Sequence, residues 1–255
     1  MNRPLILVTN DDGITAPGVR ALIEVMQTLG EVVVVAPDKP QSAMGHAITI
    51  NNTLYLNKIE MDGRTEYACS GTPADCVKMA VSEILGRKPD LCVSGINHGS
   101  NSSINIIYSG TMSAAVEAAI EGIPAIGFSL ADLDWNADFE PLKPYVKKIA
   151  SQVLENKLPE GVLLNVNFPR IPKDQIQGVR VCRQAKAMWM EKFDKRQSPG
   201  GRDYYWLTGE FVNQDKGDDT DEWALDNGYI SVVPVQFDMT AHHAMQVLNT
   251  WKLNE

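Results

Sequence analysis

Two adjacent aspartates, Asp11 and Asp12, are the residues of this 255-residue chain that point most directly to chemistry. They follow the apolar run 5–10, which is typical of a strand, and Gly13 comes directly after them. Neighbouring carboxylates repel each other unless a cation lies between them. Because α/β proteins place their sites beyond the carboxyl ends of strands, the pair predicts a site for a hard divalent cation there.

Two further oxygen donors follow later apolar runs. Ser42 lies in the loop 37–43 after the second run, and Asn97 lies in the polar segment 94–101 after a later one. If the strand ends are neighbours, both side chains lie beside the aspartates and can add a hydroxyl and an amide oxygen. A surface serine and an ordinary Gly/Asn loop are the plainer interpretations of these two positions.

An Ala-rich helical segment, 111–121, begins at the turn formed by Ser109, Gly110 and Thr111. A Ser-Gly-Thr turn at a helix N-terminus offers free backbone N–H groups, two hydroxyls and the positive end of the helix dipole. These groups predict a phosphate-binding turn. The alternative is that Ser109 or Thr111 only caps the helix.

Near the C-terminus, Asp238 and His242 are four residues apart at the start of a predicted helix, 240–251. Residues at this spacing share one helix face, so the carboxylate could orient the imidazole for proton transfer. We therefore include both as catalytic candidates, with an exposed or purely structural histidine as the alternative.

The predicted elements alternate between strand and helix over the first 172 residues, which is typical of a parallel sheet with helices on both faces. We expect an α/β fold with a Rossmann-like, mostly parallel sheet, and an antiparallel extension at 178–226 that takes part in oligomerisation. A last strand and helix within 229–255 should return to the core, so that 1–255 form a single domain. The predicted strands are 5–10, 31–36, 47–50, 53–56, 66–69, 90–94, 125–130, 162–166 and 229–234, and the predicted helices are 17–29, 72–85, 111–121, 139–154 and 240–251.

The composition limits the function classes. A formal net charge of −9 argues against a general nucleic-acid binder, although a metal ion can still supply local positive charge to a nucleotide. The four cysteines form no C-x-x-C pair, no secretory signal is apparent, and no apolar run is long enough for a membrane helix. We therefore expect a cytoplasmic protein with reduced cysteines and no membrane or nucleic-acid scaffold.

The order and spacing of these motifs resemble the SurE family (survival protein E), and the resemblance spans nearly the whole chain. It rests on V-T-N-D-D-G (8–13), A-P-x4-S (36–42), G-T-P-A-D-C-V (71–77), S-G-I-N-x-G (94–99), Y-S-G-T-x-x-A-A (108–115), D-x-x-A-x-x-x-G-Y-I-S-V-x-P (221–234) and D-M-T-A-H (238–242).

The resemblance implies a metal-dependent 5′/3′-nucleotidase that converts a nucleoside monophosphate to nucleoside and phosphate. It implies one divalent cation per subunit on Asp11, Asp12, Ser42 and Asn97, and phosphate at Ser109, Gly110 and Thr111. The oxygen-rich ligand set predicts that this cation is Mg²⁺ or Mn²⁺. The resemblance also implies a homodimer or homotetramer in which subunits exchange a C-terminal arm. The segment 186–219 matches the family pattern least.

The resulting hypothesis is hydrolysis by water that the cation activates, with His242, steadied by Asp238, as general acid. An aspartyl-phosphate formed by Asp11 or Asp12 is the open variant. Two rivals come from other classes. A receiver-type signalling module also has twin aspartates, but it needs an aspartate at the end of its third strand. A nucleotide sensor with a vestigial site would bind nucleotide without turnover.

Overall fold

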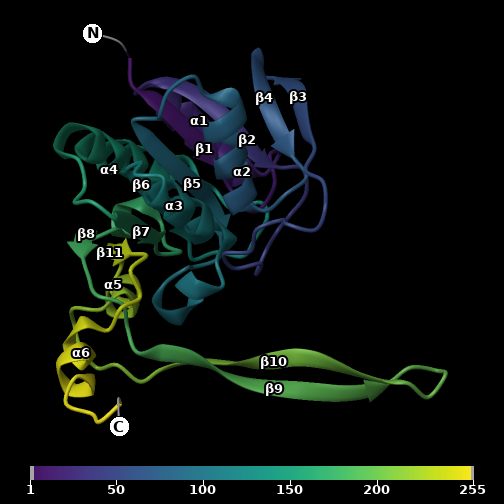
Figure 1. Cartoon of the computed structure of the whole chain (residues 1–255), viewed down its shortest axis with the longest axis vertical. Helices are drawn as coiled ribbons and strands as arrows, with labels where there is room; N and C mark the ends of the chain where they lie inside the picture. Colours follow the sequence, from purple (N-terminus) through teal and green to yellow (C-terminus); the bar gives the residue numbers. More distant parts are fainter. Residues whose placement is uncertain (1–2, 254–255) are drawn as a thin grey trace.

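The computed structural model describes residues 3–253, which form one large nine-stranded sheet and a separate two-stranded one (Figure 1). The large sheet has the strand order β3-β4-β2-β1-β5-β6-β7-β11-β8. Its central strands are parallel, which confirms the predicted α/β class. The strands of this sheet are β1 (Leu5–Thr9), β2 (Glu31–Pro37), β3 (Leu56–Met61), β4 (Arg64–Cys69), β5 (Leu91–His98), β6 (Ala125–Leu130), β7 (Val162–Phe168), β8 (Gly178–Val181) and β11 (Tyr229–Gln236).

Strand β1 shows why the middle of the sheet is apolar throughout. All five of its residues are buried, and neighbouring residues point to opposite faces. Ile6 and Val8 pack with helices α1 (Pro17–Gln27) and α4 (Lys143–Asn156) on one face. Leu7 packs on the other face with α2 (Pro73–Met79) and α3 (Gly110–Ile120). Two layers of helices therefore cover the central strands.

Local signals set the starts of these helices. Thr72 and Asp75 form a reciprocal capping box at the start of α2, and Ser109 caps α3 by accepting a hydrogen bond from the backbone N–H of Met112. The predicted helix 72–85 is interrupted, because the chain continues after Met79 as a π-helix, Ala80–Ile84. A short 3₁₀ turn, Glu140–Leu142, directly precedes α4.

Two local predictions need correction. The run 47–50 is an irregular loop, and the strand predicted at 53–56 begins only at Leu56, where it pairs with β4 through the turn at Asp62 and Gly63. Strand β5 continues to His98, and a 3₁₀ turn, Ser103–Ile107, occupies the segment that the sequence suggested as one long loop. Because β5 is longer than predicted, Asn97 lies within it, close to its carboxyl end.

The C-terminal third differs in character from the rest. Strands β9 (Ala187–Gln197) and β10 (Asp203–Asn213) form an antiparallel hairpin that projects far from the sheet (Figure 1). A 3₁₀ turn (Lys173–Gln175) precedes β8, and the short helix α5 (Asp221–Asp226) leads back to β11, which pairs with β7 and β8.

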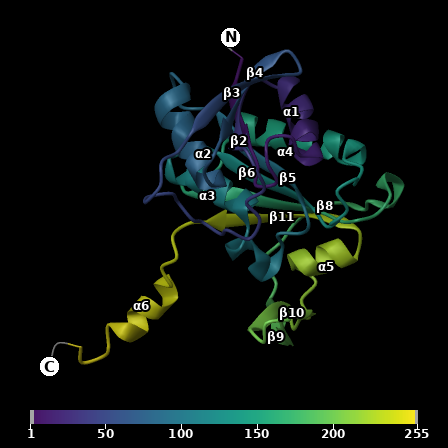
Figure 2. The same cartoon turned by 90° about the vertical axis from the view of Figure 1, so that its right-hand side faces the viewer.

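Helix α6 (His242–Leu248) does not return to the core as expected. It lies away from the sheet, and all its residues except Ala244 are exposed, with none buried (Figure 2). The reason is that the chain leaves the sheet after Gln236 along an extended segment. Among residues 3–253, no helix combines the length and the apolar character needed to cross a membrane.

Candidate active site

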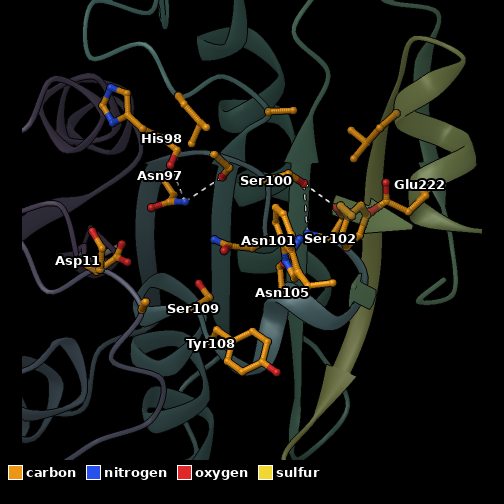
Figure 3. Close-up of a pocket in the computed structure, with 18 of the residues that line it drawn as sticks. Asp11, Asn97, His98, Ser100, Asn101, Ser102, Asn105, Tyr108, Ser109 and Glu222 are labelled. Carbon is orange, nitrogen blue, oxygen red and sulfur yellow. Dashed lines mark hydrogen bonds between the residues drawn. The ribbon is translucent and has the colours of Figure 1, made fainter. Parts of the chain in front are cut away.

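A cavity of about 530 Å³ lies at the carboxyl ends of the central strands, between the sheet and the root of the β9–β10 hairpin (Figure 3). Asp11 follows β1, Ser42 follows β2 and Asn97 ends β5, so three of the four predicted metal ligands line one space. Asp12 lies directly beside it. The predicted convergence of strand ends is what brings these distant segments together.

Asp11 is buried, with its Oδ1 accepting a hydrogen bond from the Thr111 hydroxyl at 2.5 Å. Burial raises the pKa of Asp11 to about 6, and the neighbouring charge of Asp12 adds to the rise, while the hydrogen bond from Thr111 opposes it. A carboxylate with this pKa is under electrostatic strain in the charged form. A cation beside it would relieve that strain.

Gly110 allows the N-terminus of α3 to approach Asp11 closely. A Cβ added at Gly110 would lie 2.6 Å from the Asp11 Cβ and 2.9 Å from its Oδ2. Any other residue would therefore push the carboxylate and the helix apart. The close approach to Asp11 explains the glycine at this position. The helix does not explain it, because glycine is less favourable in a helix than most residues.

Asp12 is held by His98. Its Oδ2 accepts hydrogen bonds from the His98 backbone N–H at 3.2 Å and lies 3.1 Å from the ring Nδ1. The imidazole is fixed in turn between Trp135, on which it stacks, and the edge of Phe139, each with ring centroids 5.1 Å away. The sequence analysis did not single out His98, and its position directly after Asn97 was the available signal.

Asn97 presents an oxygen rather than a nitrogen to the site. Its amide Nδ2 donates to the backbone oxygens of His98 and Gly99, at 3.1 and 2.8 Å, so its Oδ1 remains without a protein donor within residues 3–253. The loop that carries Ser42 is anchored to the segment that carries Asp11, because the Gln41 N–H donates to the Asp11 carbonyl at 2.8 Å.

These residues fit a hard divalent cation. The set offers two carboxylates, one amide oxygen and one hydroxyl, which are the ligand types that Mg²⁺ and Mn²⁺ prefer. Over the described range 3–253, no three His, Cys, Asp or Glu side chains converge to bind a metal. Asp11 and Asp12 would therefore be the only acidic ligands of the cation, and the neutral oxygens of Asn97 and Ser42 would complete its protein ligands.

The phosphate-binding turn is rearranged relative to the prediction. Ser109 lines the cavity, whereas Thr111 is completely buried and gives its hydroxyl to Asp11. Thr111 therefore acts as a partner of the aspartate instead of a phosphate ligand through its side chain. The N-terminus of α3 still points toward the site with Ser109 and Gly110 at its start.

Asp238 and His242 are not at the cavity in this chain. His242 Nε2 lies 3.0 Å from Asp238 Oδ2, as the four-residue spacing predicts, but both side chains are exposed on the segment that leads to α6. Neither residue lines the cavity. Their role in catalysis stays a prediction, because the spacing on one helix face does not determine where that helix packs.

The far wall of the cavity was missed by the sequence analysis. Tyr108, Trp189 and Phe211 supply its aromatic part, and Glu222 supplies a carboxylate. The aromatic residues of 178–226 were assigned to an oligomer interface, and only a structure shows that the hairpin root reaches the site. Burial raises the pKa of the Glu222 carboxyl, and a hydrogen bond from Ser102 opposes the rise.

The floor of the cavity is a buried network of amides. The Asn101 N–H and side chain bond to Asn167 and Ser129, at 2.8 Å each, and Asn165 donates to the Asn101 carbonyl at 2.8 Å. Each of these side chains is buried and paired. Satisfied networks of this kind hold a loop in one conformation, so the segment after β5 is rigid where it faces the site.

Comparison with known proteins agrees with this architecture. The family model described as "Survival protein SurE" matches residues 6–191. A 5′-nucleotidase SurE of Flavobacterium psychrophilum is 75% identical over the whole of both chains, and one of Flavobacterium johnsoniae is 76% identical over 99% of this chain and 98% of its own. The SurE protein crystal structure from Aquifex aeolicus has a TM-score of 0.85 at 40% identity, covering 96% of this chain and 98% of that one. Because the family model matches most of the chain and these relatives match it over nearly its full length, the chain belongs to the SurE family.

Proposed function

We propose that this protein is a metal-dependent 5′-nucleotidase that hydrolyses nucleoside monophosphates to nucleoside and phosphate. Relatives that share its full length at 75% and 76% identity carry the name 5′-nucleotidase. The observation that carries the proposal is the placement of Asp11 and Asp12 beside the start of α3 and at the rim of one cavity. Phosphate and a cation are the two species that such a junction attracts.

Asp11, Asp12, Ser42 and Asn97 would hold one divalent cation, Mg²⁺ or Mn²⁺. When bound, the cation would polarise a phosphoryl oxygen and lower the pKa of a water molecule that attacks phosphorus. Thr111 and His98 would keep the two carboxylates in position through the hydrogen bonds described above. Such supporting partners fix the geometry of a metal site.

Ser109 and the first turn of α3 would hold the phosphoryl oxygens. Backbone N–H groups at the start of a helix have no partner within it, and the helix dipole adds positive potential there. This arrangement stabilises the charge of the transferring phosphoryl group by position, without a covalent intermediate.

The protein would act as a homodimer or homotetramer. The β9–β10 hairpin exposes a series of large apolar side chains, and α6 exposes Met245, Val247 and Leu248. Contiguous exposed apolar surface of this kind is typical of protein interfaces. A second copy of the chain is the partner that the resemblance implies.

The proposal is tested by the variant Asp12→Asn in assays with a panel of nucleoside monophosphates and Mg²⁺, Mn²⁺ or EDTA. Wild type should release phosphate only with metal, and the variant should lose nearly all turnover while its circular dichroism stays unchanged. Asp174→Asn makes the same chemical change at an exposed position and should be fully active. Near-normal turnover by Asp12→Asn would contradict the proposed site.

A further inference from the structure

Two carboxylates that line the cavity, Glu222 and Asp226, have no role in the site described so far, and within the described part of the chain only Glu222 is held by a hydrogen bond to another cavity residue. Glu222 comes from the first turn of α5 and faces the cavity from the side opposite Asp11 (Figure 3). Its Oε1 accepts a hydrogen bond from the Ser102 hydroxyl at 2.5 Å. Within residues 3–253, no hydrogen bond reaches its Oε2. Half of this carboxylate is therefore fixed by the protein and half is available to a ligand.

The position of Glu222 is held by its neighbour in the sequence. Asp221 is completely buried, and its carboxylate accepts hydrogen bonds from the backbone N–H groups of Ser103 at 2.7 Å, Ala185 at 2.9 Å and Glu222 at 2.9 Å. These bonds join α5, the loop after β5 and the segment before the hairpin. The bonds of Asp221 therefore hold the backbone of Glu222 in position.

Two aromatic side chains, Trp189 and Phe211, line the same cavity as Glu222. Trp189 and Phe211 lie with ring centroids 5.5 Å apart, and the Trp189 indole N–H is already bonded to Asn105 Oδ1 at 2.8 Å. This part of the cavity therefore offers flat apolar surface and, besides the exposed Asp226, the Oε2 of Glu222, which the bond from Ser102 holds in position. A nucleoside has matching chemistry, since it combines a flat ring with hydroxyl and N–H donors.

We propose that Glu222 determines substrate specificity by accepting a hydrogen bond from the nucleoside half of the substrate, through a sugar hydroxyl or a base N–H. The inference rests on the proposed nucleotidase function and extends it to the part of the substrate that does not react. A carboxylate close to the phosphate would repel it, whereas one across the cavity meets only the neutral nucleoside.

The test is the isosteric variant Glu222→Gln, assayed with adenosine 5′-monophosphate and with p-nitrophenyl phosphate, which has no nucleoside. The ratio of kcat/KM between the two substrates should fall about ten- to a hundredfold, the range for one hydrogen bond to a charged group, and most of the change should lie in KM. Glu83→Gln, the same change at an exposed position on the π-helix, should leave the ratio unchanged.

Further substrates identify the donor. With ribose 5-phosphate, a persisting loss in Glu222→Gln assigns the hydrogen bond to the sugar, and a vanishing loss assigns it to the base. The 2′-deoxy and 3′-deoxy nucleotides then show which hydroxyl is involved. Ser102→Ala, which removes the fixed partner of Oε1, should lower the same ratio by a smaller factor.

An unchanged ratio in Glu222→Gln with the fold intact would overturn the inference, whether both activities are kept or both fall by the same factor. Either result leaves the nucleotidase proposal standing as long as wild type turns over nucleotides with metal. Absence of that turnover in wild type would instead overturn both.

Discussion

The cavity and the β9–β10 hairpin depart in opposite directions from the usual distribution of residues. Around the cavity, polar side chains such as Asp11, Thr111 and Asn167 are buried. On the hairpin, large apolar side chains such as Phe193 and Leu207 are exposed. Buried polar groups and exposed apolar groups are the informative exceptions to the rule that apolar residues lie inside. The buried polar side chains indicate a binding site for a polar ligand, and the exposed apolar side chains indicate an interface with another protein surface.

The two regions also differ in how they are held. The buried side chains of the cavity floor bond the loop after β5 to β6 and β7, so the floor depends on how three distant segments pack. The hairpin depends mostly on pairing between its own two strands, from Ala187 with Asn213 to Gln197 with Asp203. Changes at the cavity should therefore affect chemistry and stability together, whereas changes on the outer part of the hairpin, beyond Trp189 and Phe211, should affect association alone.

The largest contrast is expected from two glycine substitutions. In Gly110→Ala the new Cβ would meet Asp11 at 2.6 Å, whereas in Gly200→Ala, at the hairpin tip, nothing lies within 4 Å. Displacing a catalytic group by about 1 Å costs roughly a hundredfold in rate. Gly110→Ala should therefore lose about that factor in kcat/KM for nucleotide, and Gly200→Ala should match wild type. Similar activities for the two variants would remove the distinction between the regions.

A second test uses the pKa of Asp11 in metal-free protein. The pKa of about 6 in the folded protein lies above the ordinary value of 3.8, so the native state binds more protons and loses stability as pH rises from about 4 to 6. Asp11→Asn removes that cost and should stabilise the metal-free protein by about 2–3 kcal/mol at pH 8, although it abolishes activity.

The measurement for Asp11→Asn is urea unfolding in EDTA at several pH values. The advantage of the variant should shrink as pH falls through 6 toward 4, because the wild-type carboxyl becomes protonated in the native state. Equal stability of the two proteins at pH 8 would show that the buried carboxylate is not under electrostatic strain.

The smallest effect on folding is expected on the hairpin. Phe193 and Leu207 are opposite each other in the ladder, and they are 68% and 60% exposed. The double variant Phe193→Ser with Leu207→Ser should change the free energy of unfolding of one chain by no more than about 0.5 kcal/mol, because surface substitutions act weakly. Its molecular mass by light scattering should nevertheless fall below that of wild type.

Lys192→Ser provides the control for this measurement, since it changes the neighbouring residue on the opposite face of the ribbon. It should keep the wild-type mass. A monomeric wild type, or an unchanged mass in the double variant, would contradict the assignment of the hairpin to association.

Much of the core could be predicted because its signals are local. The apolar runs at 5–9 and 31–36 became parallel neighbours, and Thr72 with Asp75 formed the capping box that their spacing predicts. Asp11, Ser42 and Asn97 line one cavity because strand ends in such a sheet share an edge. The run 47–50 was misassigned, because its residues fit a strand but the segment is bonded instead to the start of α2, through Thr49 and Asp75 and through Ala47 and Thr72.

The rest depends on contacts between distant segments. That Thr111 would turn its hydroxyl to Asp11 depends on how closely α3 packs at Gly110, which no local pattern encodes. Glu222 and Trp189 reach the cavity only because Asp221 ties α5, the loop after β5 and the hairpin root together. The pairing of His242 with Asp238 is the opposite case, since it is local and formed without any contact to the site.

The ladder of the hairpin has a mechanical consequence. Trp189 and Phe211 are paired at its root and line the cavity, while Phe193 and Leu207 lie four residues further along each strand and therefore on the same face. One continuous ribbon thus has one end in the wall of the cavity and the other far out in solvent (Figure 1). A partner that binds the outer part of the hairpin would therefore also restrain the positions of Trp189 and Phe211 in the wall of the cavity.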